Sequence, residues 1–219
     1  MAYITCFNRM IDTETNTLVF DFGTNEIPKG ITKIGDRVFF ERTDLTEMVI
    51  PDGVTEIGES AFWGCTNLKS VVIPESVTKI GSHAFWGCTG LESVIIPDSV
   101  IEIEDWAFHN CVSLTSISVP NGVAKIGHRA FDGCTNLKLV VIPKSVTEIS
   151  SGAFLKCVGL TSVIIPDSVT EIGDHAFKNC IRLKNITIGN GVKSIGYRAF
   201  EGCTELTSET REVSLLHGK

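Results

Sequence analysis

Seven of the eight cysteines in this chain of 219 residues recur at intervals of 23 residues. Cysteines at regular spacings could form disulfides or bind a soft metal ion. Here every unit places its thiol at the same repeat position, among apolar positions that recur in the same way. The pattern therefore favours a row of small, buried, free thiols without the basic partner that would make them reactive. These cysteines are Cys65, Cys88, Cys111, Cys134, Cys157, Cys180 and Cys203.

The other residues that could do chemistry do not combine into a site. The five histidines are scattered over four repeat positions, the two that share a position lie four units apart, and none has a metal-binding spacing. No Ser–His–Asp or Cys–His set is brought together by the pattern. One row of turn residues is acidic, but one oxygen per unit is a poor cage for Ca²⁺, which takes six to eight ligands. The sequence predicts no enzymatic activity, no cofactor and no metal. The turn row is Asp52, Glu75, Asp98, Asn121, Lys144 and Asp167.

Composition excludes several classes of protein. Hydrophobic residues make up 43% of the chain and charged residues 21%, as in a globular protein. The net charge of −7 argues against a nucleic-acid partner. No apolar run approaches the length of a membrane span, so we expect no membrane insertion. The first ten residues lack the features of a signal peptide, so either the protein stays inside the cell or a leader precedes this numbering.

A 23-residue repeat positions the cysteines. A fixed period of this length is typical of a solenoid, in which each repeat is one coil stacked on the next. We expect about eight coils over residues 27–206. The phenylalanine that recurs in every unit is Phe39, Phe62, Phe85, Phe108, Phe131, Phe154, Phe177 and Phe200.

One unit can be divided into short elements. Its end, L-x-x-V-x-I, predicts a strand in which Leu91, Val94 and Ile96 point inward while Ser93 and Ile95 point outward. A turn begins at the recurring proline. V-T-x-I predicts a second extended stretch, and A-F-x-G-C predicts a single helical turn. The fold class is thus an α/β solenoid that is mostly β.

The helical turn is followed by Gly or Asn in six units, such as Gly64 and Asn110. These two residue types together indicate a backbone with positive φ that closes the turn. Lys156 stands at the same position and breaks the pattern. We expect strain there.

The unit from Ile73 to Leu91 reads I-P-E-S-V-T-K-I-G-S-H-A-F-W-G-C-T-G-L. It resembles the BspA-type branch of the leucine-rich repeats, named for a bacterial surface antigen, and the resemblance covers roughly residues 27–206. It implies a right-handed leucine-rich-repeat superhelix with a parallel sheet on its concave side. It also implies adhesion or other protein binding, usually at a microbial cell surface. The family brings no catalytic or cofactor residues.

Both ends depart from the repeat. In residues 1–26, Tyr3–Phe7 and Thr17–Phe22 are rich in β-forming residues, and we expect a hairpin-like cap over the first coil. At the other end, residues 207–219 lose the strand pattern. We interpret them as a ragged cap or a point of truncation.

The outward row of the expected concave sheet is one candidate binding surface. An exposed apolar stripe flanked by small polar residues suits protein binding. Alternatively, β-branched residues stand there because they favour strands. The row is Val49, Val72, Ile95, Ser118, Val141, Ile164 and Thr187.

An aromatic edge is the second candidate. The recurring phenylalanine is followed in successive units by Phe40, Trp63, Trp86 and His109. Trp106 lies one turn before this row on the same edge, with His83 and Arg129 at its own position in the flanking units. Trp106 beside Arg129 predicts a cation–π pair. Aromatic and arginine clusters are typical interface anchors, and partial burial of the rings against neighbouring coils explains them equally well. We expect this edge, with Trp63 and Trp86 foremost, to contribute to recognition, and the concave row is the alternative.

A ladder of alternating charge runs through the V-T-x-I stretches. Opposite charges in neighbouring coils would lie about 4.8 Å apart and fix the register of stacking. The ladder is Lys33, Glu56, Lys79, Glu102, Lys125, Glu148 and Glu171.

The sequence thus predicts a monomeric, non-enzymatic protein-binding module. Its partner is expected to be another protein, such as an extracellular host or matrix protein, which would make the chain an adhesin-like or host-interaction protein that is secreted or held at the cell surface. The alternative is an intracellular, cytoplasmic scaffold or a structural spacer.

Overall fold

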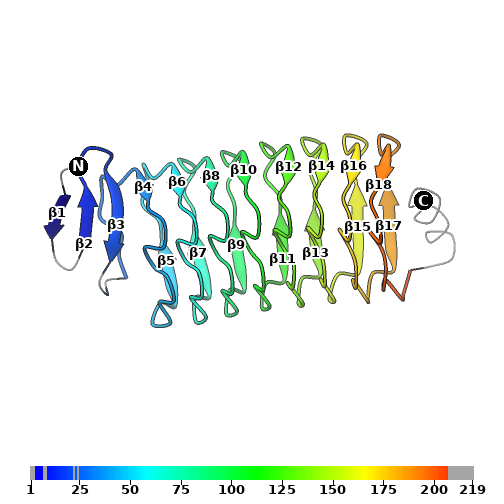
Figure 1. Cartoon of the computed structure of the whole chain (residues 1–219), viewed down its shortest axis with the longest axis horizontal. Helices are drawn as coiled ribbons and strands as arrows, with labels where there is room; N and C mark the ends of the chain where they lie inside the picture. The colour runs from blue at the N-terminus through cyan, green and yellow to red at the C-terminus, as the bar shows by residue number, and fades with distance from the viewer. Residues whose placement is uncertain (1–2, 7–8, 22, 24, 207–219) are drawn as a thin grey trace.

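The computed structural model describes residues 3–6, 9–21, 23 and 25–206, which form a mostly-β solenoid of about seven turns. The coils stand side by side in one row between the two termini (Figure 1). The eight coils expected are not all formed in the described residues, because the eighth unit is described only to Leu206 and has a short strand but no long one there. The right-handed sense and the concave curvature stay predictions.

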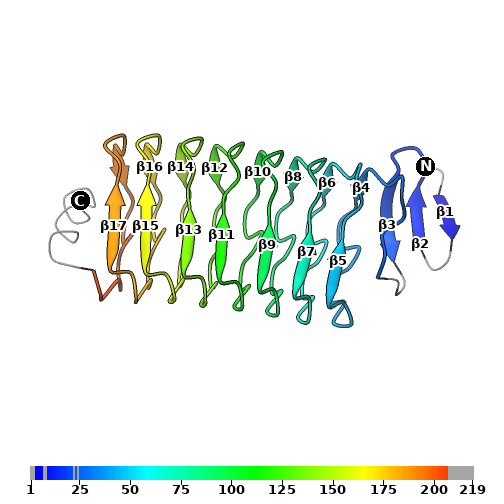
Figure 2. The same cartoon turned by 180° about the vertical axis from the view of Figure 1, so that it is seen from behind.

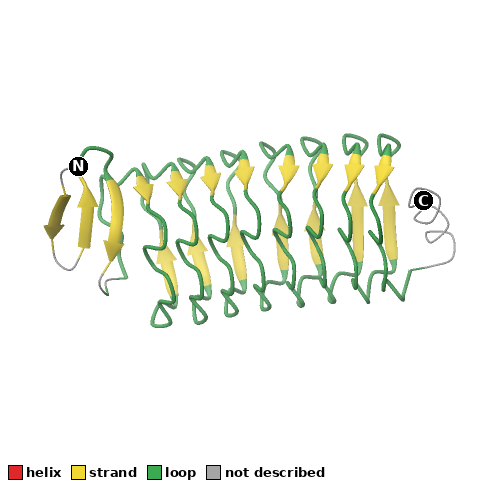
Figure 3. Cartoon of the chain, in the orientation of Figure 1, coloured by secondary structure: helices red, strands yellow, loops and turns green. Residues whose placement is uncertain are grey.

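The described residues contain strands, turns and loops but no helix (Figure 3). The α part of the predicted α/β class is therefore wrong. The A-F-x-G-C segments form tight hydrogen-bonded turns, as where the amide of Trp63 donates to the carbonyl of Ser60 at 3.1 Å. The recurring Gly or Asn ends the turn before a second residue can continue it into a helix.

Each of the first seven coils contains one long and one short strand, and we number the coils from the recurring proline. The coils are coil 1 (28–50), coil 2 (51–73), coil 3 (74–96), coil 4 (97–119), coil 5 (120–142), coil 6 (143–165), coil 7 (166–188) and the described part of coil 8 (189–206). The long strands, from the L-x-x-V-x-I segments, are β5 (Glu47–Val49), β7 (Ser70–Val72), β9 (Ser93–Ile95), β11 (Ser116–Ser118), β13 (Leu139–Val141), β15 (Ser162–Ile165) and β17 (Asn185–Ile188).

The V-T-x-I stretches are strands, as predicted, and join the N-terminal strands in one sheet of eleven. Each has an inward isoleucine and an outward, mostly charged residue. The short strands are β4 (Lys33–Ile34), β6 (Glu56–Ile57), β8 (Lys79–Ile80), β10 (Glu102–Ile103), β12 (Lys125–Ile126), β14 (Glu148–Ile149), β16 (Glu171–Ile172) and β18 (Ser194–Ile195).

The long strands form two parallel sheets instead of one continuous sheet. One contains β5, β7 and β9, and the other contains β11, β13, β15 and β17. Figure 2 shows the seven long strands from behind in their order along the row. The division lies between coil 3 and coil 4.

Between the sheets lies one continuous core, built from the residues that recur. Leu91, Val94 and Ile96 are buried, whereas Ser93 and Ile95 are exposed, as predicted. The phenylalanine rings of successive coils stack with centroids 4.9–5.5 Å apart. A ring stacked on both sides has no room for a smaller or polar substitute, which explains why this position does not vary.

Three strands precede the first coil. They are β1 (Tyr3–Cys6), β2 (Arg9–Asp12) and β3 (Thr17–Asp21); β1 pairs with β2, β2 with β3, and β3 runs parallel to β4. The two β-rich segments of the expected hairpin therefore do not pair with each other, because β2 lies between them. At the other end, residues 207–219 lie outside the described residues.

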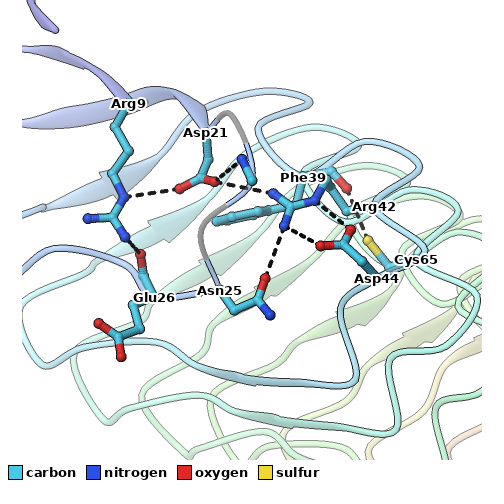
Figure 4. Close-up of polar contacts among 9 residues, drawn as sticks. Arg9, Asp21, Asn25, Glu26, Phe39, Arg42, Asp44 and Cys65 are labelled. Carbon is cyan, nitrogen blue, oxygen red and sulfur yellow. Dashed lines mark hydrogen bonds and ion pairs between the residues drawn. The ribbon is translucent and has the colours of Figure 1, made fainter. Parts of the chain in front are cut away.

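The first coil is joined to these strands by charge. Arg42 stands where the other coils have cysteine, and its guanidinium reaches the buried carboxylate of Asp21 at 3.2 Å. Arg9 contacts the other oxygen of that carboxylate at 3.1 Å (Figure 4). Arg42 also pairs with Asp44 at 2.7 Å, so its charge is satisfied twice. A buried carboxylate between two arginines ties β2 and β3 to coil 1.

Candidate functional site

An apolar stripe runs along the outer side of the long strands. In each of these strands the central residue points into the core and its two neighbours point outward. Ile95 is 82% exposed, Val49 66% and Ile164 65%. Residues in register, such as Val72 and Ile95 in β7 and β9, lie directly beside each other. We call the exposed apolar members of this row the strand stripe: Val49, Val72, Ile95, Val141 and Ile164.

The aromatic residues gather on the turns, away from the strand stripe. Trp63 and Trp86 stack face to face with centroids 4.5 Å apart and planes 3° from parallel. Phe40 stacks on the outer side of Trp63 at 6.0 Å, and Trp106 lies 5.0 Å from Trp86. These four rings, with His83 and His109, form what we call the aromatic edge. Sequence spacing predicted that the four aromatic rings and the two histidines lie on one edge.

The rings of the aromatic edge cover one another. Trp63, Trp86 and Trp106 are partly buried, because each ring lies against rings in the neighbouring coils. Stacked rings offer solvent their edges, where the aromatic quadrupole is positive, and hide their faces. A partner at this surface would therefore meet ring edges and the Arg129 guanidinium. That guanidinium lies 4.7 Å from the Trp106 centroid, as the predicted cation–π pair requires.

A row of positive-φ residues holds the aromatic edge in place, and sequence reasoning missed it. His83, Trp106 and Arg129 have φ of 58°, 60° and 51°, although none is glycine. In this conformation the amide of Trp106 donates to the carbonyl of His128 in the next coil at 2.8 Å. Hydrogen bonds to the next coil thus offset the backbone strain. No residue-type signal marks the row, because its members range from Gly152 to Trp106.

The predicted turn-closing residues do adopt positive φ. Gly64 and Asn110 have φ of 71° and 57°. Lys156, which breaks the sequence pattern, has φ of 58°. A residue with a Cβ thus adopts a left-handed conformation that glycine adopts at lower cost.

The aromatic stack ends at a buried carboxylate in coil 5. His109 packs on Trp86 at 4.0 Å, and its Nδ1 lies 3.5 Å from Oδ2 of Asp132. The Asp132 side chain is 3% exposed and also lies 3.5 Å from Arg129. Burial lowers the pKa of His109 to about 4, and the charges of Arg129 and Lys156 act in the same direction. Burial raises the pKa of Asp132 against the effect of the same two cations.

The seven cysteines of the row, one in each of coils 2–8, are confirmed as buried, free thiols. Each Sγ donates to the carbonyl of the phenylalanine in the preceding coil, as from Cys65 to Phe39 at 3.0 Å and from Cys134 to Phe108 at 3.2 Å. Burial raises the pKa of Cys134 to about 12. A thiol with such a pKa is not a nucleophile at neutral pH. Within the described residues, no cluster of three or more His, Cys, Asp or Glu is arranged to hold a metal ion.

The charge ladder forms as predicted. Lys33 pairs with Glu56 at 3.0 Å and Lys125 with Glu148 at 2.6 Å across neighbouring short strands. All these groups are partly exposed, so each pair stabilises the fold only modestly.

No helix in the described part of the chain is long and apolar enough to cross a bilayer.

Comparison with known proteins places the chain in a family. The model of the BspA type leucine rich repeat region matches residues 20–138 and 101–215 in six copies. No curated protein matches. A leucine-rich repeat protein of T. pallidum is 36% identical with a TM-score of 0.77, and the alignment covers 90% of this chain and 94% of that one.

A second solved structure is a leucine rich cell surface protein of Faecalibacterium prausnitzii. It is 26% identical with a TM-score of 0.63, over 94% of this chain and 87% of that one. A leucine-rich repeat protein of Bacteroides ovatus shares the fold at 24% identity and a TM-score of 0.50, over 94% of this chain and 79% of that one. With the repeat, the stacked phenylalanine and cysteine rows and the matching family model, the chain belongs to the BspA-type leucine-rich repeat family.

Proposed function

We propose that this chain is a non-enzymatic protein-binding module that works outside the cell, as an adhesin-like or host-interaction protein. The observation that carries the proposal is the strand stripe. Its side chains are exposed although they are apolar, and Ile95 keeps 82% of its surface in solvent. Val49, Val72 and Ile95 lie in register on three neighbouring strands, and Ser118 separates them from Val141 and Ile164. An exposed apolar surface rimmed by polar residues is typical of a protein interaction site.

Within each of the two long-strand sheets the strand stripe is also rigid. Its residues alternate with buried ones, so packing of the core sets the register of the strands. The buried Val71 pairs with the buried Val94, and this fixes Val72 beside Ile95. A preorganised surface loses little conformational entropy on binding, which favours affinity. The flanking serines, including Ser70 and Ser93, can supply hydrogen bonds at the rim.

The aromatic edge is the second candidate surface. Trp63 and Trp86 would act as its anchors, with Arg129 and Phe40 beside them. The rings already cover each other's faces, so this edge has less apolar area left for a partner than the strand stripe has. We therefore place recognition first on the strand stripe and second on the aromatic edge.

A surface location is supported by the F. prausnitzii relative, which is described as a cell surface protein. The partner would then be an extracellular host or matrix protein. The alternative is an intracellular scaffold or a structural spacer. The uniform rows of core residues are equally compatible with that role, because they stabilise the solenoid whatever it binds. Antibody labelling of intact against permeabilised cells separates them, because a surface protein is labelled before permeabilisation.

The test of binding uses the purified chain on a panel of immobilised extracellular-matrix proteins. Ile95→Lys places a charge at the most exposed position of the strand stripe and should weaken any binding more than tenfold. Trp63→Ala with Trp86→Ala is the matched variant on the aromatic edge and should change binding less. The reverse ranking would move recognition to the aromatic edge. No binding to any member of the panel by the wild-type chain would contradict the adhesin-like role.

A further inference from the structure

The joint between coil 3 and coil 4 differs from the other joints, and the difference begins at a glycine row. After each short strand the chain passes directly over the backbone of the preceding coil. A Cβ added at Gly35, Gly58, Gly81 or Gly127 would come within 2.6–2.9 Å of backbone atoms there. Real side chains do not tolerate such distances, so a residue with a Cβ must displace its coil. In coil 4 this position is Glu104.

The long-strand sheet is interrupted at the same joint. β9 of coil 3 and β11 of coil 4 do not pair, although every other neighbouring pair of long strands does. Just before these strands, the amide of Thr115 lies 3.4 Å from the carbonyl of Glu92. The equivalent bonds from Glu92 to Lys69 and from Lys138 to Thr115 measure 3.0 and 2.9 Å. The two coils are therefore further apart on this face.

A second coil supports this cause. Ser150 in coil 6 is the other residue of the glycine row that carries a Cβ. At its joint with coil 5, β13 and β15 keep a single pair, Leu139 with Ser162, whereas β11 and β13 keep three. The smaller side chain thus accompanies the smaller loss of pairing.

On the opposite face the Glu104 side chain holds the joint together. Its carboxylate accepts hydrogen bonds from the amide and the hydroxyl of Ser82 at 2.8 and 2.9 Å. It also pairs with Lys79 at 2.6 Å. The joint is therefore braced along the short strands and open along the long strands, which is the arrangement of a hinge.

Coil 4 is also loosely tied to coil 5. Its short strand β10 pairs with β12 through Ile103 and Ile126 alone. At one repeat position the backbone amide donates to the carbonyl of the same position in the preceding coil, as from Thr78 to Thr55. In coil 5 this position is Ala124, and among the described residues its amide makes no such bond to the carbonyl of Ile101 in coil 4. A hollow of about 810 Å³ opens beside this joint, lined by Ile101, Gly122 and Ala124 among others.

The aromatic edge crosses these two joints. Trp86 of coil 3 contacts Trp106 and His109 of coil 4 at 5.0 and 4.0 Å. Trp106 in turn lies under Arg129 of coil 5 at 4.7 Å. The rings thus supply contacts where the backbone ladders are weakest.

We propose that coil 4 is an articulation point of the solenoid and that the aromatic edge is the clasp that keeps it closed. Coils 1–3 and coils 5–8 then behave as two stiff segments whose relative tilt changes the shape of the long-strand face. This inference stands whether or not the strand stripe binds a partner, because it concerns only the contacts between coils 3, 4 and 5.

Amide hydrogen exchange, measured by NMR on the folded chain, tests the proposal. The slowest amides of β11 should exchange about tenfold or more faster than those of β7 and β13, since local opening needs fewer bonds to break there. Trp86→Ala should widen this difference by about a further tenfold. Trp63→Ala is the matched control, because it faces joints whose strands are fully paired, and it should leave β11 unchanged.

A pair of variants at Glu104 keeps the test decisive if the tryptophan variants fold poorly. Glu104→Ala keeps the Cβ and removes the brace, so β11 should exchange faster. Glu104→Gly removes both and restores the glycine row, so β11 should exchange about tenfold more slowly than in Glu104→Ala. Equal exchange of β7, β11 and β13 in the wild type, or equal exchange in the two Glu104 variants, would overturn the hinge.

Discussion

The buried phenylalanine row and the row that follows it are neighbours in sequence but opposite in character. Phenylalanine occupies its position in every coil, whereas the next residue is Phe40, Trp63, Trp86, His109, Asp132, Leu155, Lys178 or Glu201. The first row points into the core and stacks on itself. The second lies on the turn, where Asp132 and Leu155 are buried and the other members are exposed or partly exposed. Identical surroundings select one side chain in the core, because each ring must match two rings of the same shape. The surface row is free to vary and therefore carries what distinguishes this chain from another with the same fold.

The largest expected effect is on the core row. Phe131→Ala should lower the free energy of unfolding by roughly 3–5 kcal/mol, because it leaves a cavity between two stacked rings. Lys178→Ala, in the neighbouring row, should cost no more than about 0.5 kcal/mol, since its ion pair with Glu201 is partly exposed. Urea unfolding measures both. Similar losses for the two variants would contradict the contrast between the rows.

The junction at the first coil should show the next largest effect. Asp21→Asn removes the charge that Arg9 and Arg42 share and should cost about 2–3 kcal/mol. Because a solenoid unfolds from a weakened end, exchange of the β4 amides should increase more than that of the β16 amides. Asp44→Asn is the control, since Asp44 is exposed and Arg42 keeps Asp21. An equal loss in both variants would show that the buried carboxylate has no special role.

Acid should weaken the end of the aromatic stack. The pKa of His109 is lowered to about 4, below its ordinary value of 6.5, so the folded chain binds fewer protons there than the unfolded chain. Its contribution is fully present above about pH 6.5 and is lost as the pH falls toward 4. The raised pKa of Asp132 acts in the opposite sense, since its contribution is present at low pH and lost as the pH rises.

The expected net effect is a loss of about 1–2 kcal/mol between pH 6.5 and 4 that His109→Gln removes. Thermal unfolding at several pH values measures it. Because the other titrating groups remain in both proteins, the difference between wild type and variant isolates His109. An unchanged pH profile in the variant would mean that folding does not lower the pKa of His109.

The smallest expected effect is a gain. Lys156→Gly relieves a positive φ of 58° and should stabilise the chain by about 0.5 kcal/mol, after the greater flexibility of glycine in the unfolded chain is subtracted. Lys156→Ala keeps the strained backbone and should give no gain. Denaturant midpoints of the two variants provide the comparison, and a larger gain for alanine would point to the lysine charge as the source of instability.

Much of the fold and part of the candidate site could be predicted from sequence. The period predicts the solenoid, the buried thiols, the in-and-out pattern of Leu91–Ile96 and the pairing of Trp106 with Arg129, because each depends only on residues at fixed separation. The absence of a helix in the described residues was not foreseen, since five residues of mixed preference do not decide between a turn and a helix. The spacing also places His83 and His109 at the aromatic edge, because each shares a repeat position with one of its tryptophans. The ring-to-ring stacking that covers their faces, and the burial of His109 against Asp132, depend on the geometry of the turn.

By itself, the sequence determined the repeat, the composition of the core and the family, because a fixed period makes every coil impose the same packing on the next. Only the tertiary structure decided where the stack is imperfect. Whether Glu104 is a harmless exception depends on how closely the backbone of coil 3 approaches it, and that distance follows from the stacking of all the coils together. The same holds for the tryptophans, since their faces are hidden by rings 23 residues away or nearby in the adjoining coil. Exposure, strain and the break between β9 and β11 are properties of contacts between coils, which no single repeat contains.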